Sequence, residues 1–101
     1  MSYRPKFANP DMDDLFKAIL TLKTEEECYR FFEDLCTIKE IQDMAQRMKV
    51  AQLLDEKASY QEIAKQTHAS TATISRVNKA LIYGAEGYHI VLKALKDHIK
   101  K

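Results

Sequence analysis

The sequence contains 101 residues, of which 46% are hydrophobic, and its formal net charge is +1. This length fits a single domain over residues 1–101, and the hydrophobic content excludes an intrinsically disordered chain. The N-terminal residues lack the apolar run of a signal peptide, and no segment is long enough to span a membrane. We therefore expect a cytoplasmic protein that does not contact a membrane.

Charge is distributed unevenly along the chain. Residues 1–50 hold eight Lys/Arg against ten Asp/Glu, whereas residues 51–101 hold eight against five. The second half is therefore mildly basic although the whole chain is nearly neutral, so any contact with an acidic partner is expected there.

The first helix is predicted to follow Asn9-Pro10, because asparagine caps helices and proline fits their first position. Its apolar stripe consists of Met12, Leu15, Phe16, Ile19 and Leu22. The carboxylates of Asp11, Asp13 and Asp14 favour the positive end of the helix dipole. A metal site at these aspartates is the alternative, but no second cluster of ligands accompanies them.

Three capping boxes predict the next three helix starts, at Thr24–Glu27, Thr37–Glu40 and Ser59–Glu62. Cys28 and Cys36 follow the first box in a helical pattern, and without a secretion signal we expect reduced core thiols rather than a disulfide. No alternating pattern suggests a strand, so the chain is expected to be all-α.

The fifth and sixth helices are predicted from Ser70 to about Gly84 and from about Gly87 to the C-terminus. Gly84 is interpreted as the glycine that follows a helix end. Inward-facing residues of the sixth helix are expected at Val91, Ala94, Leu95 and His98 or Ile99, and the basic residues suited to its C-terminal dipole are Lys96, Lys100 and Lys101.

A helix-turn-helix is predicted over about residues 59–82. Two short helices separated by about three residues must cross closely, and Ala64 supplies the small residue that a close crossing needs. Ile63, Ile74 and Val77 supply the apolar contacts that would fix the angle between the helices. His68 stands in the turn where glycine is common, and histidine tolerates a left-handed backbone better than most residues.

The outer face of the second helix of this motif is typical of a DNA reader. Its side chains are short near the N-terminus and cationic later, which suits a helix that enters the major groove tip first. From Ile63 to Ala85 there is no acidic residue. An ordinary corner of a helical bundle is the alternative. The predicted DNA contacts are Lys65, Ser70, Thr71, Ala72, Thr73, Ser75, Arg76 and Lys79.

The segment RMKVAQLLDEKASYQEIAKQTHASTATISRVNKAL, from Arg47 to Leu81, resembles the Trp repressor superfamily, and within it the Trp-repressor-like YerC/YecD group. The resemblance implies a six-helix fold and an intertwined homodimer, with a helix-turn-helix projecting from each protomer. By matching positions, Thr71, Ala72 and Ser75 resemble base-facing residues, and Lys65 resembles a residue that contacts the DNA backbone.

The resemblance also implies a possible effector pocket at Arg47, Thr73 and Arg76, which match the corepressor-binding residues of the family. Arg47 matches only if a one-residue gap is allowed; without it Gln46 takes that place. Val77 and Ala80 stand where the Trp repressor has glycine and serine, so we expect that tryptophan does not bind. The two arginines are expected instead to pair with acids of the third helix or to bind phosphate.

These features together predict a homodimeric, sequence-specific transcriptional regulator, most simply a bacterial repressor, that binds an operator in double-stranded DNA. One alternative is a replication-related DNA-binding domain, and another is a helical protein-interaction module. No nucleophile–base pair, glycine-rich phosphate loop or metal cluster predicts an enzyme, and neither a cofactor nor a catalytic residue is expected.

Overall fold

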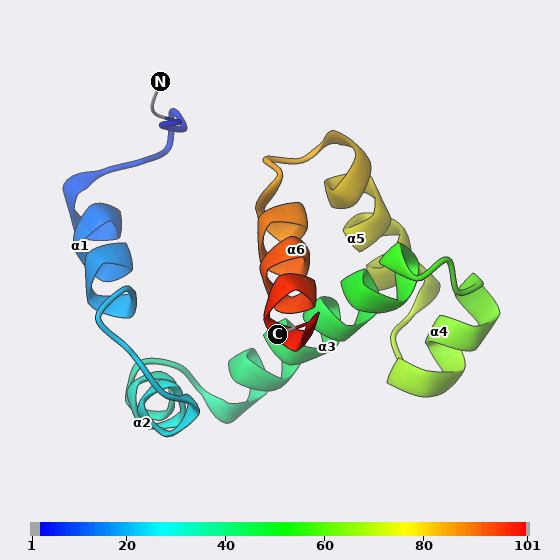
Figure 1. The fold of residues 1–101 in the computed structure, drawn as a ribbon, viewed down its shortest axis with the longest axis horizontal. Helices are drawn as coiled ribbons and strands as arrows, with labels where there is room; N and C mark the ends of the chain where they lie inside the picture. Colours follow the sequence, from blue (N-terminus) through cyan, green and yellow to red (C-terminus); the bar gives the residue numbers. More distant parts are fainter. Residues whose placement is uncertain (1–2, 101) are drawn as a thin grey trace. The chain divides into compact units, whose positions relative to one another are not determined.

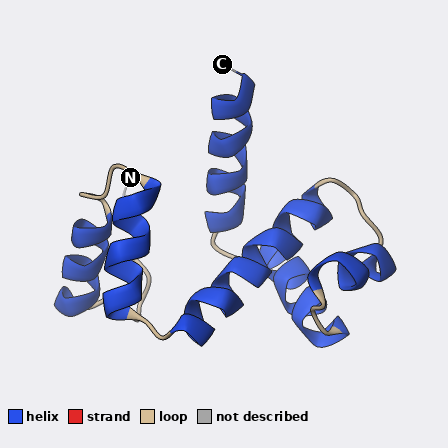
Figure 2. Ribbon diagram, turned by 90° about the horizontal axis from the view of Figure 1, so that it is seen from below, coloured by secondary structure: helices blue, strands red, loops and turns tan. Residues whose placement is uncertain are grey.

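The computed structural model describes residues 3–100, with side chains described for residues 3–98. Within this range the chain forms six helices and no strand (Figures 1 and 2), as the sequence predicts. The helices are α1 (Pro10–Ile19), α2 (Glu25–Leu35), α3 (Ile38–Asp55), α4 (Tyr60–Thr67), α5 (Thr71–Tyr83) and α6 (Gly87–Lys100).

The predicted caps begin the helices because they satisfy backbone donors that have no partner within the helix. The Asn9 side chain accepts from the Met12 amide at 2.8 Å. Thr24 Oγ1 accepts from the Glu27 amide at 3.1 Å, and the Glu27 carboxylate accepts from the Lys23 amide at 2.8 Å. These contacts confirm the helix starts predicted at Asn9 and Thr24, although Glu27 accepts from the amide before Thr24 and not from that of Thr24 itself.

Two compact units make up the chain, and they divide between Thr37 and Ile38. The first unit contains α1 and α2. None of its described side chains is buried, and Arg4 makes two hydrogen bonds to the Asp13 carboxylate, at 3.0 and 3.2 Å.

A single domain over residues 1–101 stays a prediction. Cys28 and Cys36 are free thiols as expected, but Cys28 is exposed, so its placement in the core was wrong.

The second unit is organised around α3, which contacts α4, α5 and α6 (Figure 1). One cluster of buried side chains joins α3, α4 and α5. Its members are Val50, Ala51, Leu53, Ile63, Ala69, Ile74 and Val77. Since α4 and α5 share this cluster with α3, the three helices hold one another at fixed angles.

Three residues on one face of α6 attach it to the rest of the second unit. His89 Nε2 lies 2.7 Å from the Leu81 carbonyl oxygen of α5, and Lys96 Nζ donates to Asp55 Oδ2 of α3 at 2.6 Å. Leu92 lies between them in sequence and is buried. The positions i, i+3 and i+7 share one side of a helix, so these contacts act together.

Within the single chain, the inward face predicted for α6 was wrong. Leu92 is buried, whereas Val91, Ala94, Leu95 and His98 are exposed. The amphipathic stripe of α6 is wide, and α3 and α5 cover only the part that contains Leu92. The Ile99, Lys100 and Lys101 side chains lie outside the described residues.

The helix end predicted at Gly84 is confirmed in position but not in conformation. Gly84 caps α5 with φ −83° and ψ −158°, which is extended rather than left-handed backbone. Glycine is required there for another reason: a Cβ atom on Gly84 would overlap the Ala80 carbonyl oxygen. Positive φ angles occur instead at the non-glycine residues Lys57, His68 and Glu86.

The Asp55–Lys96 ion pair is expected to make the stability of the fold depend on pH. The hydrogen bond from the Lys96 ammonium lowers the pKa of Asp55 below its ordinary value. A carboxyl group whose pKa is lower in the folded state stabilises the fold above its unfolded pKa, and this stabilisation is lost as pH falls through the folded pKa. Lys96→Met should therefore lower the melting temperature at pH 6, and the difference should vanish in strong acid.

Thermal unfolding of both proteins between pH 2 and pH 7 measures this difference. Lys93→Met is the control, since Lys93 lies on the same helix and is exposed. A loss for Lys96→Met that is the same at every pH would contradict the ion-pair origin.

Candidate nucleic-acid interface

The turn between α4 and α5 is built from three local hydrogen bonds. His68 ends α4 in the left-handed conformation, with φ 60° and ψ 16°, and its amide donates to the Ala64 carbonyl at 2.8 Å. Thr67 Oγ1 donates to the Ile63 carbonyl at 2.7 Å and accepts from the Ala69 amide at 3.1 Å. The expectation that histidine adopts the left-handed backbone of this turn is therefore confirmed.

Both helices of the α4–α5 pair begin at a serine cap. Ser59 Oγ accepts from the Glu62 amide and Ser70 Oγ from the Thr73 amide, each at 3.1 Å. The Glu62 carboxylate does not complete the predicted capping box, because it accepts from the Gln66 amide group at 2.9 Å. The helix starts are nevertheless where the sequence predicts them.

The inner face of the α4–α5 pair is apolar and buried. Ile63, Ile74 and Val77 have at most 2% of their surface exposed, and all three belong to the cluster shared with α3. Ala64 packs against this cluster as the small residue expected at the helix crossing. Because α5 is anchored along one side, its opposite side is fixed in direction.

The outer face of α5 gathers five of the predicted DNA contacts. At 3.6 residues per turn these residues fall within an arc of roughly 140°. All five are exposed: Thr71, Ala72, Ser75, Arg76 and Lys79. The face therefore presents hydroxyl and methyl groups near the helix start and cationic groups further along, with no carboxylate.

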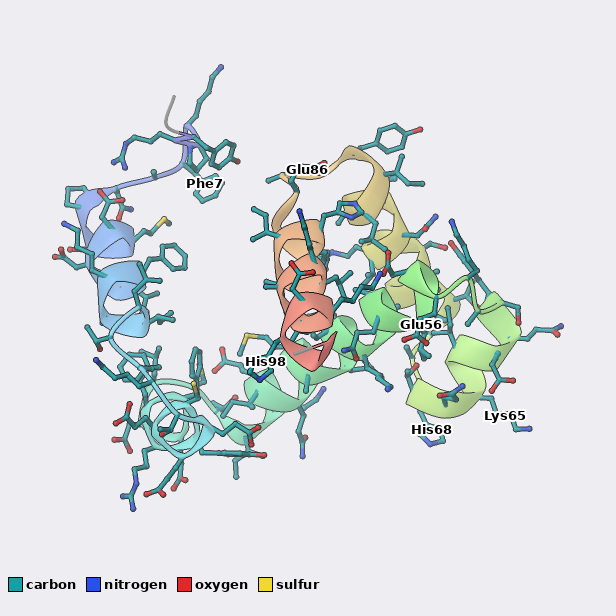
Figure 3. All side chains as sticks on the ribbon, in the orientation of Figure 1. Phe7, Glu56, Lys65, His68, Glu86 and His98 are labelled. Carbon is teal, nitrogen blue, oxygen red and sulfur yellow. The ribbon has the colours of Figure 1, made fainter. Side chains whose placement is uncertain are left out.

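The other predicted contacts lie around this face. Lys65 of α4 and His68 of the turn are both exposed. Figure 3 shows both residues toward the end of α4 that leads into the turn. Ser70 is exposed, and its hydroxyl donates to Thr73 Oγ1 at 3.1 Å. Thr73 is half-buried, and both its amide and its hydroxyl are hydrogen-bonded to the Ser70 hydroxyl that caps α5.

The residues of the possible effector pocket are less clearly assembled. Arg47 is half-buried on α3, while Arg76 is exposed on α5. An apolar cavity of about 490 Å³ lies between α3, α5 and α6, but its lining includes Met48, Ala80 and Tyr88 and none of Arg47, Thr73 and Arg76. Neither arginine has an ion pair among the described residues, so the expected pairing with acids of α3 was wrong, and the alternative that they bind phosphate stays a prediction.

Sequence reasoning missed a contact that joins α3 to the turn. The Gln46 side-chain amide donates to the Thr67 carbonyl at 3.0 Å, and both residues are half-buried. Gln42, Gln46 and Lys49 form a polar stripe with i, i+4, i+7 spacing on α3, and this signal in the sequence could have indicated that a polar surface faces the α4–α5 pair.

Two kinds of feature are absent from the part of the chain that the structure describes. No group of three or more His, Cys, Asp or Glu side chains there could hold a metal ion. No described helix combines the length and apolar character needed to cross a membrane.

The chain is similar to proteins of one family over nearly its full length. The family model described as Trp repressor protein matches residues 10–96. The protein YerC of Bacillus subtilis strain 168 is 52% identical over 92 residues, which cover 91% of this chain and 88% of YerC. These matches span the α3 helix and the whole α4–α5 pair.

Two solved structures resemble this fold closely. A TrpR-like protein from Eubacterium eligens has a TM-score of 0.87 and 50% sequence identity, covering 90% of this chain and 94% of that one. A protein from Staphylococcus aureus described as a candidate Trp repressor has the same TM-score and 45% identity, covering 90% and 91%. The predicted fold class is thereby confirmed.

Proposed function

Since this chain belongs to the Trp repressor protein family, we propose that it is a sequence-specific DNA-binding transcriptional regulator, most simply a repressor, in which the α4–α5 pair acts as a helix-turn-helix. The family membership confirms the resemblance seen between Arg47 and Leu81. The main observation behind the proposal is the outer face of α5, which is exposed, free of acidic residues and fixed in direction by the buried Ile74 and Val77.

The proposed contacts follow from the chemistry of each side chain. Thr71, Ala72 and Ser75 would meet base edges, because short hydroxyl and methyl groups near a helix tip can approach the floor of the major groove. Lys65, Arg76 and Lys79 would meet phosphates, and the Ser70–Thr73 cap would bring the α5 amides toward the DNA backbone.

We further propose that two copies of the chain act together. Among residues 3–37 no described side chain is buried, and large apolar groups such as Phe16, Tyr29 and Leu35 are exposed. On α6, Val91 and Leu95 are exposed as well. A chain of this size rarely leaves so much apolar surface in water, so a second copy is the natural cover.

Selection of genomic DNA fragments by the purified protein, followed by sequencing, tests the proposal. We expect one enriched motif with two half-sites about one helical turn apart, and sedimentation is expected to give two chains per bound operator. Absence of any bound fragment at low salt would contradict DNA binding and favour the protein-interaction alternative.

Substitutions on the outer face are expected to separate base contacts from phosphate contacts. Thr71→Ala or Ser75→Ala should change the preferred motif. Lys65→Ala or Lys79→Ala should weaken binding to all sequences alike and reduce the salt slope by about one unit for each lost phosphate contact. Salt-dependent gel shifts measure both effects. Lys93→Ala, which removes a cation from exposed α6 surface, is the control. A changed motif with an unchanged salt slope for Lys79→Ala would contradict this orientation of α5.

Tryptophan is expected not to be the effector. Val77 is buried in the cluster between α3 and α5, and its β-branched side chain fills the space that glycine would leave. Inserting an indole there would require overpacking, which costs roughly 1–3 kcal/mol. Titration with L-tryptophan should therefore give no saturable heat and no change in operator affinity. A tenfold tighter operator complex would contradict this expectation.

A further inference from the structure

A groove lined mostly by polar residues lies between α3 and the turn of the α4–α5 pair. Its volume is about 700 Å³, and its lining includes Lys39, Asp43, Gln46, Lys49, Thr67 and His68. All of these residues belong to the second compact unit. The groove lies on a different side of α3 from the apolar cavity at Met48.

Within the described range, three donor side chains of the groove have no hydrogen-bond partner: Gln42, Lys49 and His68. Lys39 Nζ donates to Asp43 Oδ1 at 2.6 Å, so these opposite charges offset each other. The Gln46 amide is engaged by the Thr67 carbonyl. Among the described residues, Lys49 and the His68 ring have neither an ion pair nor a hydrogen bond. An ammonium group and an imidazole N–H together suit an oxyanion.

His68 is one of three non-glycine residues with a positive φ, and it is the one that lines this groove. Its φ of 60° lies in the left-handed region, which costs a residue with a side chain roughly 1–2 kcal/mol and costs glycine nothing comparable. The His68 side chain at this position is exposed and lines the groove. Backbone strain of this kind is a reason to look for a function of the side chain.

We propose that this groove binds an oxyanion of the phosphate type between Lys49 of α3 and His68 of the turn. The anion would bridge α3 to the turn beside the Gln46–Thr67 hydrogen bond, only two residues before the cap of α5 at Ser70. The phosphate has two possible sources: a free phosphate-type anion or the backbone of bound DNA. The second source rests on the proposed function, whereas the first does not.

Sodium phosphate is the probe for the free anion. The full-length protein is titrated at constant ionic strength, with sodium chloride as the matched salt, and backbone and imidazole NMR signals are followed. We expect saturable shifts at residues 46–49 and 67–69 with phosphate only. Lys49→Gln and His68→Gly should each weaken this response by about tenfold or more, as expected for the loss of one charge-assisted hydrogen bond.

His68→Gly also separates the two roles of this residue. Glycine relieves the backbone strain, so the variant should unfold at an equal or higher temperature while it loses the phosphate response. Lys57→Gly is the matched control, because it also replaces a residue with positive φ, removes a cation and lies outside the groove lining. It should keep the phosphate response.

Gel shifts with the selected DNA distinguish the two sources. If the DNA backbone supplies the phosphate, Lys49→Gln should reduce the salt slope by about one unit while leaving the preferred motif unchanged. If a free anion supplies it, the phosphate shifts appear and the slope does not change. The proposal is overturned if chloride reproduces the shifts, or if neither the shifts nor the slope responds to Lys49→Gln and His68→Gly. If the parent protein fails to bind DNA, the proposed function is overturned. The phosphate titration then tests the anion site by itself.

Discussion

Replacing Ile74 by alanine is expected to lower the free energy of unfolding by about 2–5 kcal/mol. The Ile74 side chain is 1% exposed and packs in the cluster that joins α3, α4 and α5. Truncation would remove buried apolar surface and leave a cavity that three helices cannot close without shifting. Because the same contact fixes the direction of α5, operator affinity should fall together with stability.

Chemical denaturation of the parent protein and the variant measures the loss. Ile82→Ala is the matched control, since it makes the same change on the same helix at a side chain that is 59% exposed. We expect this control to change stability by less than about 0.5 kcal/mol. Equal losses for the two variants would mean that α5 is not anchored through Ile74.

The two glycines of the chain are expected to respond to alanine in opposite directions. At Gly84 a Cβ atom would overlap the Ala80 carbonyl oxygen, which is backbone that cannot rotate away. Gly84→Ala should therefore destabilise the fold by about 1–3 kcal/mol, as overpacking commonly does. At Gly87 an added Cβ meets nothing within 4 Å. Gly87→Ala should stabilise the fold by about 0.4–1 kcal/mol, because alanine reduces the freedom of the unfolded chain.

Thermal and urea unfolding of the two single variants provide the comparison, and each variant serves as the control for the other. A stabilising effect of Gly84→Ala would show that the end of α5 can move away from Ala80. In that case the connection to α6 would be less constrained than its hydrogen bonds indicate.

Features that depend on neighbouring residues in sequence were predictable. The caps at Asn9, Thr24, Ser59 and Ser70 and the left-handed turn at His68 were recognised because each depends on a few adjacent residues. The buried triad of Ile63, Ile74 and Val77 was recognised from helical spacing. The outer face of α5 followed, because the opposite side of an anchored helix is determined by its periodicity.

Features that depend on which elements meet were not predictable in the same way. The stripe on α6 is wide enough to bury either Leu92 or Leu95, and only the positions of α3 and α5 decide between them. The hydrogen bonds from Gln46 to Thr67 and from Lys96 to Asp55 join residues 21 and 41 positions apart. A local sequence pattern does not predict which residues pair over such separations. The end of α5 was predicted at Gly84 for the wrong reason, since close approach rather than a left-handed backbone requires glycine.

The central position of α3 has a consequence for how proteins with this fold can diverge. Because one helix contacts α4, α5 and α6, a change in a buried α3 residue such as Val50 or Leu53 alters several packing surfaces at once. Such changes are coupled and need compensating substitutions elsewhere. Thr71, Ala72 and Ser75 lie outside this shared cluster and can vary one at a time. If α5 reads DNA as proposed, new DNA preferences can arise by single substitutions on α5, whereas changes in the buried residues of α3 need compensating substitutions.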